Sequence, residues 1–302
     1  MTKIKSVNND PNMADDTATN QLQLTTFHLK LITLIAMLID HIGWVFVATY
    51  SMTAEIMHTV GRLVAPMMAY FLVMGLCHTQ NQWAYLGRLL AFAVLSQPIF
   101  MAFQYVIGSV DIVTQVLWGN VLFSLAASLA ALMIWQMSVP MTLRVLGVLA
   151  MAMIAEIGEY GAAMVMWVMV FEIFKHDKLL QLTAYALSVP LAHYLIYGWA
   201  LTVGLGWMNV GMFFALPLIY YHTGQQGCRL GGRYFFYLFY PIHLLMLCLF
   251  GPDCLLVQNF AITSPLGQCR YSCVPLYCLV VTVLMATMSA KIHARAGEFL
   301  PR

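Results

Sequence analysis

The sequence predicts an all-α polytopic membrane protein with about ten transmembrane helices and both termini in the cytoplasm. Hydrophobic residues make up 62% of the 302-residue chain and charged residues only 9%, and the mean hydropathy is +0.80. Because soluble domains carry about 25% charged residues, this composition excludes that class. A helix needs roughly 20 apolar residues to cross about 30 Å of hydrocarbon, and the chain contains many such windows.

Apolar windows, separated at Gly, Pro and charged residues, define the predicted helices. They cover approximately residues 29–50, 60–77, 85–107, 115–137, 142–156, 160–175, 179–199, 206–221, 233–251 and 274–292. The windows at 142–156, 160–175 and 206–221 are short for a full crossing, which predicts that they are tilted, broken or re-entrant.

Positive charge alternates between the two sides of this arrangement, as membrane orientation requires, because cytoplasmic loops retain Lys and Arg. Twelve of the 14 basic residues fall on one side, and only Arg62 and Arg270 fall on the other. We therefore place both termini in the cytoplasm. The cytoplasmic set consists of Lys3, Lys5, Lys30, Arg88, Arg144, Lys175, Lys178, Arg229, Arg233, Lys291, Arg295 and Arg302.

A single domain accounts for most of the chain. Residues 1–27 are polar and lack the apolar core of a secretory signal, so they are predicted to form a disordered cytosolic tail. Residues 28–293 are predicted to form one transmembrane domain with an external loop at 252–273, and residues 294–302 a second cytosolic tail.

Three cysteines cluster in the predicted external loop. Cys254, Cys269 and Cys273 would face an oxidising compartment there, which favours a disulfide. Three unpaired thiols are the alternative, and the spacing does not decide the pairing.

Several function classes find no support in the sequence. The net charge is only +2, and no Lys/Arg cluster is dense enough to predict binding of nucleic acid. The motifs of zinc proteases, phosphate-binding loops and serine hydrolases are absent. We therefore expect neither a bound metal nor a serine nucleophile.

Asp40 and His41 lie deep within the first predicted span, in the stretch LIAMLIDHIGWVF. An ionisable residue in a span costs about 3 kcal/mol or more when it faces lipid, so such residues usually face the bundle interior and mark functional sites. Neighbouring residues on a helix point about 100° apart, so each of the two needs a partner from another helix. Arg62, predicted to open the second span from the outer side, is the candidate partner of Asp40.

Two interpretations of this group remain open. In the first, an Asp40–Arg62 pair neutralises both charges and leaves His41 as an uncharged base that accepts a proton from an amine or a hydroxyl. In the second, the pair only ties two helices together, and His41 donates a hydrogen bond within the bundle.

Two weaker candidates follow later in the chain. Glu156 and Glu159 are three residues apart, which predicts either one helical face that binds an amine or a cation, or an exposed external turn. His243 lies in the middle of a span behind Pro241, whose missing N–H leaves a backbone carbonyl free to bond elsewhere.

Six stretches between residues 29 and 247 carry a resemblance to a known family. They are LKLITLIAMLIDHIG (29–43), VGRLVAPMMAYFLVMGLCHT (60–79), YLGRLLAFAVLSQPIF (85–100), GNVLFSL (119–125), EYGAAMVM (159–166) and GRYFFYLFYPIHLLML (232–247). Asp-His in the first span, Gly-Arg-x-x-x-Pro opening the second and His-Thr ending it form a specific combination. Together they resemble the TraX family of conjugal-transfer membrane proteins, associated with N-terminal acetylation of pilin. Glu159, Tyr160 and Gly161 stand where that family tends to have Asp-Tyr-Gly.

The resemblance implies an acyltransferase in the bacterial inner membrane that moves an acetyl group from acetyl-CoA to the N-terminal amine of a pilin subunit. The residues expected to be catalytic are His41, Asp40 and Arg62. The residues expected to bind the CoA donor are His78, Arg88, Arg144 and Arg233. The residues expected to bind the acceptor are Glu159, Tyr160 and His243.

Two other classes of function stay open at this point. Buried Asp, His and Arg in a many-helix protein also fit a proton-coupled transporter or channel, although the two halves of the chain show no convincing repeat. A non-catalytic assembly factor that holds pilin in the membrane is the third class.

Overall fold

The computed structural model describes residues 23–48, 51–108, 119–202, 208–227 and 234–251, apart from the side chains of 197–208. Within these residues every regular element is a helix, and two isolated β-bridges accompany them. The predicted all-α class is therefore confirmed. The predicted external loop with its cysteines, the tenth span, the C-terminal tail, Arg233 and most of the N-terminal tail lie outside the described residues.

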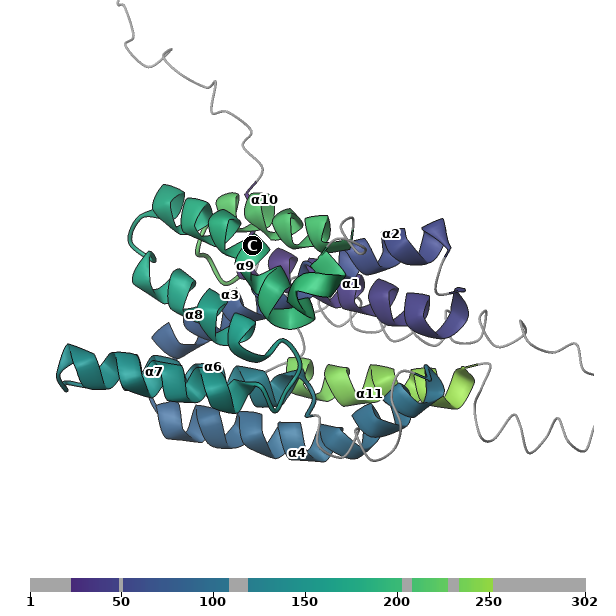
Figure 1. Ribbon diagram of the computed structural model, residues 1–302, viewed down its shortest axis with the longest axis horizontal. Helices are drawn as coiled ribbons and strands as arrows, with labels where there is room; N and C mark the ends of the chain where they lie inside the picture. The colour runs from purple at the N-terminus through teal and green to yellow at the C-terminus, as the bar shows by residue number, and fades with distance from the viewer. Residues whose placement is uncertain (1–22, 49–50, 109–118, 203–207, 228–233, 252–302) are drawn as a thin grey trace, which may run out of the picture.

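The chain runs back and forth through a series of helices (Figure 1). They are α1 (Thr26–Phe46), α2 (Met52–Gly61), α3 (Val64–Cys77), α4 (Gln82–Val106), α6 (Val121–Trp135), α7 (Met141–Ala155), α8 (Gly161–Ile173), α9 (Lys178–Thr202), the 3₁₀ helix η1 (Met208–Phe214), α10 (Ala215–Tyr220) and α11 (Phe235–Phe250). The stretches long and apolar enough to cross a membrane, among the described residues, are Thr26–Phe46, Met52–Cys77, Gln82–Val106 and Lys178–Ile196. The protein is thus a helical membrane protein, while the total of ten spans and the orientation stay predictions.

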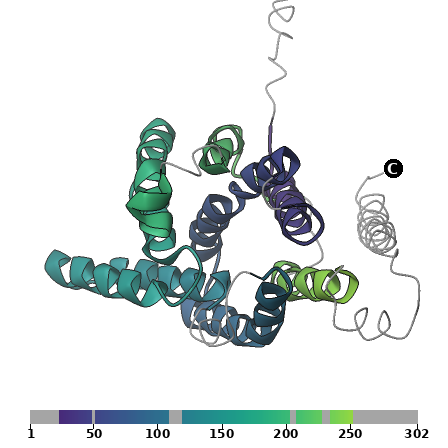
Figure 2. The same ribbon diagram turned by 45° about the vertical axis from the view of Figure 1, so that its right-hand side comes forward.

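Helix α8 lies at the centre of the bundle, because it packs against α3, α6, α7 and α9. Its side chains Trp167 and Phe171 are fully buried. Helix α4 packs against both α6 and α11, and α1 packs along α2. In Figure 2 the yellow-green α11 and the blue α4 lie together below the purple α1–α2 pair.

The second predicted span was placed wrongly. It was predicted at residues 60–77, but one apolar stretch, Met52–Cys77, contains two consecutive helices. The polar side chains of Glu55 and His58 lower the hydropathy of the first half of this stretch. The apolar pattern of the sequence therefore does not indicate where the stretch begins. Arg62 therefore lies well inside the span and not at its outer end.

Pro66 explains why the second span is broken. A proline inside a helix clashes with the carbonyl of the residue four positions earlier, which here is Arg62. In the first turn of a new helix the same proline is tolerated, since its missing N–H would be unsatisfied there anyway. Helix α2 accordingly ends at Gly61, and α3 begins at Val64.

His222 ties several helices together at the end of the bundle where α1 begins. Its ring contacts the Tyr70 hydroxyl through Nδ1 at 2.9 Å and the Thr26 hydroxyl through Nε2 at 3.1 Å. Its backbone carbonyl accepts a hydrogen bond from Lys178 Nζ at 2.9 Å. Burial, and then the charge of Lys178, lower the pKa of His222 to about 4, so the ring is neutral near pH 7.

Two glycines let α1 and α2 approach closely near their junction. A Cβ atom added to Gly61 would overlap the side chain of Asp40 on α1. A Cβ atom added to Gly43 would lie 3.2 Å from His58 Cε1 on α2. The absence of a side chain at these positions therefore sets the distance between the two helices.

We expect Gly61→Ala to lower the free energy of unfolding by about 1–3 kcal/mol, because the added methyl group has no room beside Asp40. The matched control is Gly87→Ala, since Gly87 is also helical but has no heavy atom near its Cβ position. That control should be neutral or stabilise the protein by up to about 1 kcal/mol. Unfolding in detergent measures both, and equal stability of the two variants would contradict this account of the α1–α2 contact.

Candidate active site

A cavity of about 360 Å³ lies where the break between α2 and α3 faces α1, α4, α11 and the starts of α6 and α8. Its polar lining consists of Asp40, His41, Arg62, Gln104, Glu159, Tyr160 and Tyr240. Apolar side chains such as Trp44, Met68, Phe100 and Phe103 form much of the remaining wall. A few polar groups in a mostly apolar cavity of this size are typical of a small-molecule site.

His41 presents an unprotonated nitrogen when its ring is neutral. Its Nδ1 atom lies 2.7 Å from the carbonyl oxygen of Met37, one turn earlier on α1. A carbonyl oxygen only accepts hydrogen bonds, so Nδ1 carries the proton and Nε2 keeps its lone pair. The ring also packs edge-on against Phe103 of α4, with centroids 5.2 Å apart. These two contacts orient the His41 ring on the wall of the cavity.

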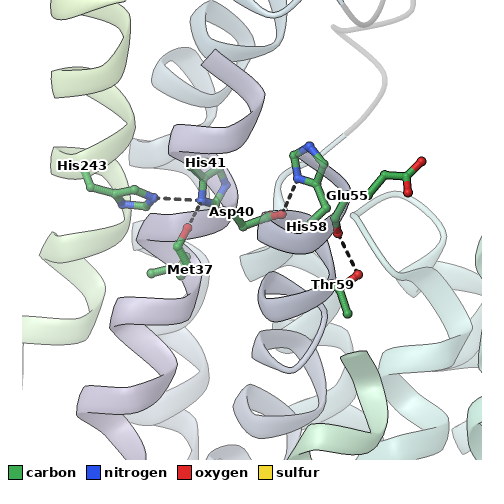
Figure 3. A network of polar contacts seen from close by, with 7 residues as sticks. All are labelled: Met37, Asp40, His41, Glu55, His58, Thr59 and His243. Atoms are coloured by element: carbon green, nitrogen blue, oxygen red, sulfur yellow. Dashed lines mark hydrogen bonds and ion pairs between the residues drawn. The ribbon is translucent and has the colours of Figure 1, made fainter. Parts of the chain in front are cut away.

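Asp40 pairs with His58, a residue that the sequence analysis did not identify. His58 Nδ1 lies 2.8 Å from Asp40 Oδ1, as Figure 3 shows. The His58 ring is almost fully buried beneath Trp44, with centroids 4.1 Å apart. Arg62, the predicted partner of Asp40, stands at the helix break, on the wall of the same cavity. A spacing of four residues from Arg62 was the signal that could have identified His58, because it places both on one face of α2.

Two helix N-termini bring positive partial charge to the cavity. Val64 and Val121, the first residues of α3 and α6, both line it. The first N–H groups of a helix have no partner within the helix and carry the positive end of its dipole. Together with the Arg62 guanidinium, they make this wall suited to hold negative charge.

Glu159 belongs to a turn, so the prediction of a helical face shared with Glu156 is wrong. Tyr160 and Gly161 have φ values of 66° and 45°, which end any helical path there. Glu156 points away, and its carboxylate accepts a hydrogen bond from Ala162 N–H at 2.8 Å. Glu159 lines the cavity, and the Ser124 hydroxyl donates to its backbone carbonyl.

The carboxyl group of Glu159 titrates close to neutral pH. Burial, and then the nearby charge of Asp40, raise its pKa to about 7. The charge of Arg62 and a hydrogen bond from Val121 N–H act in the opposite direction. Near neutral pH this group is therefore divided between a neutral acid and a carboxylate.

His243 lies behind His41 and does not line the cavity. Its Nδ1 atom is 2.8 Å from the carbonyl oxygen of Phe239, and its Nε2 atom is 3.4 Å from Nδ1 of His41. The residue of α11 that lines the cavity is Tyr240, one turn before His243. His243 thus contacts His41, and its predicted role in binding the acceptor stays a prediction.

Three of the predicted donor-binding residues, His78, Arg88 and Arg144, lie at the other end of the bundle, and the fourth, Arg233, lies outside the described residues. Arg88 precedes the cavity residue Gln104 by 16 positions on α4, which separates them by about 24 Å. His78 follows the end of α3, and Arg144 lies in the first turn of α7, where its Nε donates to the Val139 carbonyl at 3.0 Å. The structure therefore does not bring these residues to the cavity.

The fold and the cavity together define an integral membrane protein of helices with an acid, an imidazole and a guanidinium group in its interior. The family model described as TraX protein matches residues 26–251. The chain therefore belongs to the TraX family. It is also 36% identical over 236 residues to the probable fimbrial assembly protein FimC, serogroup H1, of Dichelobacter nodosus, an alignment that covers 75% of this chain and 96% of the relative. No solved structure matches the chain.

The Asp40–His58 pair can be tested by a double-mutant cycle. We expect Asp40→Asn and His58→Phe each to lower the free energy of unfolding by about 1.5–3 kcal/mol, because each removes a hydrogen bond to a charged group. The double variant should lose clearly less than the sum, by about 1 kcal/mol or more. Denaturant unfolding in detergent gives all four values. Strict additivity would show that the two side chains do not interact.

Proposed function

We propose that the protein is a membrane-embedded acetyltransferase that moves an acetyl group from acetyl-CoA to the N-terminal amine of a pilin subunit in the bacterial inner membrane. The observation that carries the proposal is the neutral tautomer of His41, in which Nε2 is unprotonated. His41 lies on the wall of a partly apolar cavity. The name of the fimbrial assembly relative supports a role in pilus assembly. The resemblance of the motifs to those of proteins associated with pilin acetylation supports acetyl as the transferred group.

The residues of the cavity divide into three roles in this proposal. Glu159 and Tyr160 bind the positively charged amine of the acceptor. His41 Nε2 removes a proton from that amine, which can then attack the thioester carbonyl. Arg62 and the first N–H groups of α3 stabilise the negative oxygen of the tetrahedral intermediate. The C–N bond forms, the C–S bond breaks, and the thiolate of CoA takes up a proton.

The position of His41 along α1 agrees with an acceptor that arrives from outside. The helix rises 1.5 Å per residue, so His41 lies about 22 Å from Thr26 and about 8 Å from Phe46. With the predicted orientation, the cavity is nearer the external face. In this proposal acetyl-CoA enters from the cytoplasm, where Arg88, Arg144, Arg233 and His78 bind its phosphates, and the pantetheine arm reaches inward.

The broken α2–α3 span favours one alternative function, a proton-coupled transporter. Broken helices such as α2–α3 are frequent at the substrate sites of transporters. A transporter, or a non-catalytic assembly factor, would leave the pilin amine unmodified. Mass spectrometry of the pilin N-terminus, with and without this protein, separates these functions from the proposed one by the presence or absence of one acetyl group.

His41→Ala should reduce the rate of acetyl transfer about 10²–10⁴-fold, because a positioned base contributes acceleration of that order. The measurement uses the purified protein, labelled acetyl-CoA and a pilin peptide, together with thermal unfolding to show that the variant is folded. His176→Ala is the control, since His176 is exposed in the turn between α8 and α9. Acetylation by a folded His41→Ala variant at the parental rate would reject the assignment of the base.

The raised pKa of Glu159 predicts how binding of the acceptor depends on pH. Its carboxyl group should be mostly neutral at about pH 6 and mostly ionised at about pH 8, so KM, expressed for the ammonium form of the acceptor, should fall about tenfold over this interval. Glu159→Gln should remove this dependence, because the amide does not titrate. KM values measured across the interval test this, and an unchanged pH dependence in the variant would show that another group binds the amine.

A further inference from the structure

Acetylation of an N-terminal amine requires two protons to leave the same nitrogen. The amine has a pKa of about 7.7–8.0, so at neutral pH it arrives mostly as an ammonium ion. One proton must leave before the nitrogen can attack, and a second leaves as the amide forms. The thiolate of CoA accepts only one of them, so a full turnover releases one proton into the site.

His41 and His243 form a head-to-tail pair that can hold this proton. His243 Nδ1 donates to the Phe239 carbonyl at 2.8 Å, so its Nε2 is the unprotonated nitrogen in the neutral ring. That Nε2 lies 3.4 Å from His41 Nδ1, which carries the proton of the neutral His41 ring (Figure 3). The single Nδ1–H of His41 is thus shared between the Met37 carbonyl at 2.7 Å and His243 Nε2 at 3.4 Å, and a proton added at His41 Nε2 makes this N–H a stronger donor toward both.

The surroundings of His243 make it a site for one additional charge away from the acceptor. The side chain is 4% exposed, and the Phe239 ring stacks on it with centroids 5.0 Å apart. The titratable or charged groups around the histidine pair are Asp40 of α1, His58 of α2, Arg62 at the helix break, Glu159 of the turn before α8 and Tyr240 of α11 itself, while α4 contributes the apolar Phe103. Asp40 is thus the nearby negative charge that balances a positive imidazole pair.

We propose that His243 is a positioning residue that takes a proton from His41 Nδ1 during turnover, an inference that rests on the proposed acetyl transfer. The pair removes the first proton from the ammonium ion, so that the free amine attacks the thioester. It then gives a proton to the leaving thiolate, and it accepts the second proton from the nitrogen as the amide forms. The products are amide, thiol and one proton that remains on the pair until it leaves the site.

The informative variant is His243→Gln, because a glutamine carbonyl can still accept a hydrogen bond from His41 but cannot take up its proton. We expect kcat/KM of the variant, relative to the parental protein at the same pH, to fall about 20-fold at pH 6.5, where only about one acceptor molecule in twenty is a free amine. The ratio should return to within about threefold at pH 9, where the acceptor is already an amine. Using the ratio cancels the titration of Glu159, which both proteins share.

A second acceptor makes the test independent of the pH change. A pilin peptide whose N-terminal amine is replaced by an aminooxy group has an uncharged acceptor nitrogen at pH 6.5, so His243→Gln should acetylate it at close to the parental rate. His176→Gln serves as the control, and thermal unfolding shows whether each variant is folded. An equal loss for the amine and the aminooxy acceptor, or no loss with either, would overturn the role of His243. Absence of transfer by the parental protein with both acceptors would instead reject the proposed function.

Discussion

The break in the second span is the constraint on which the rest of the site depends. Backbone groups inside an apolar layer must be satisfied by the protein, so an interrupted helix persists at that depth only where it is buried or lines a cavity. Pro66 prevents the helix from continuing past the Arg62 carbonyl. The interruption places a guanidinium group and the free N–H groups of α3 at one point, where the other helices leave a cavity.

The polar side chains around this break are held in place by neighbouring groups. Asp40 can lie beside the break because Gly61 has no side chain, and His58 holds its carboxylate from the same helix that the break ends. Glu159 faces the same positive wall from a turn whose backbone is tied to the start of α6, since Glu159 N–H donates to the Gly119 carbonyl at 3.1 Å. The nearby partners of these groups offset part of the cost of taking them out of water.

Local patterns predicted the helices well but predicted their contacts less well. The bounds of α7, α8 and α11 follow from apolar runs ended by Pro, Gly and charged residues, and the structure agrees within about two residues. Asp40, His41, Arg62, Glu159 and Tyr160, which the sequence singled out, all line one cavity. His58 was missed because its polarity concealed the helix that carries it. The pairing of His243 with His41 depends on how α11 packs against α1, which no local pattern encodes.

The same contacts distinguish a fixed site from a moving one. A carrier must expose its binding site to each side of the membrane in turn, which requires the broken helix to shift against its neighbours. Here the Asp40–His58 pair and the close approach at Gly43 and Gly61 hold the broken span against α1, and His222 ties α1 to α3 at the other end. A rigid interior is suited to a reaction in which two substrates reach one stationary base from opposite sides. The cavity lies near one end of α1, and His78, Arg88 and Arg144 lie near the other end of the bundle, so the proposed transfer requires the donor to reach across the interior.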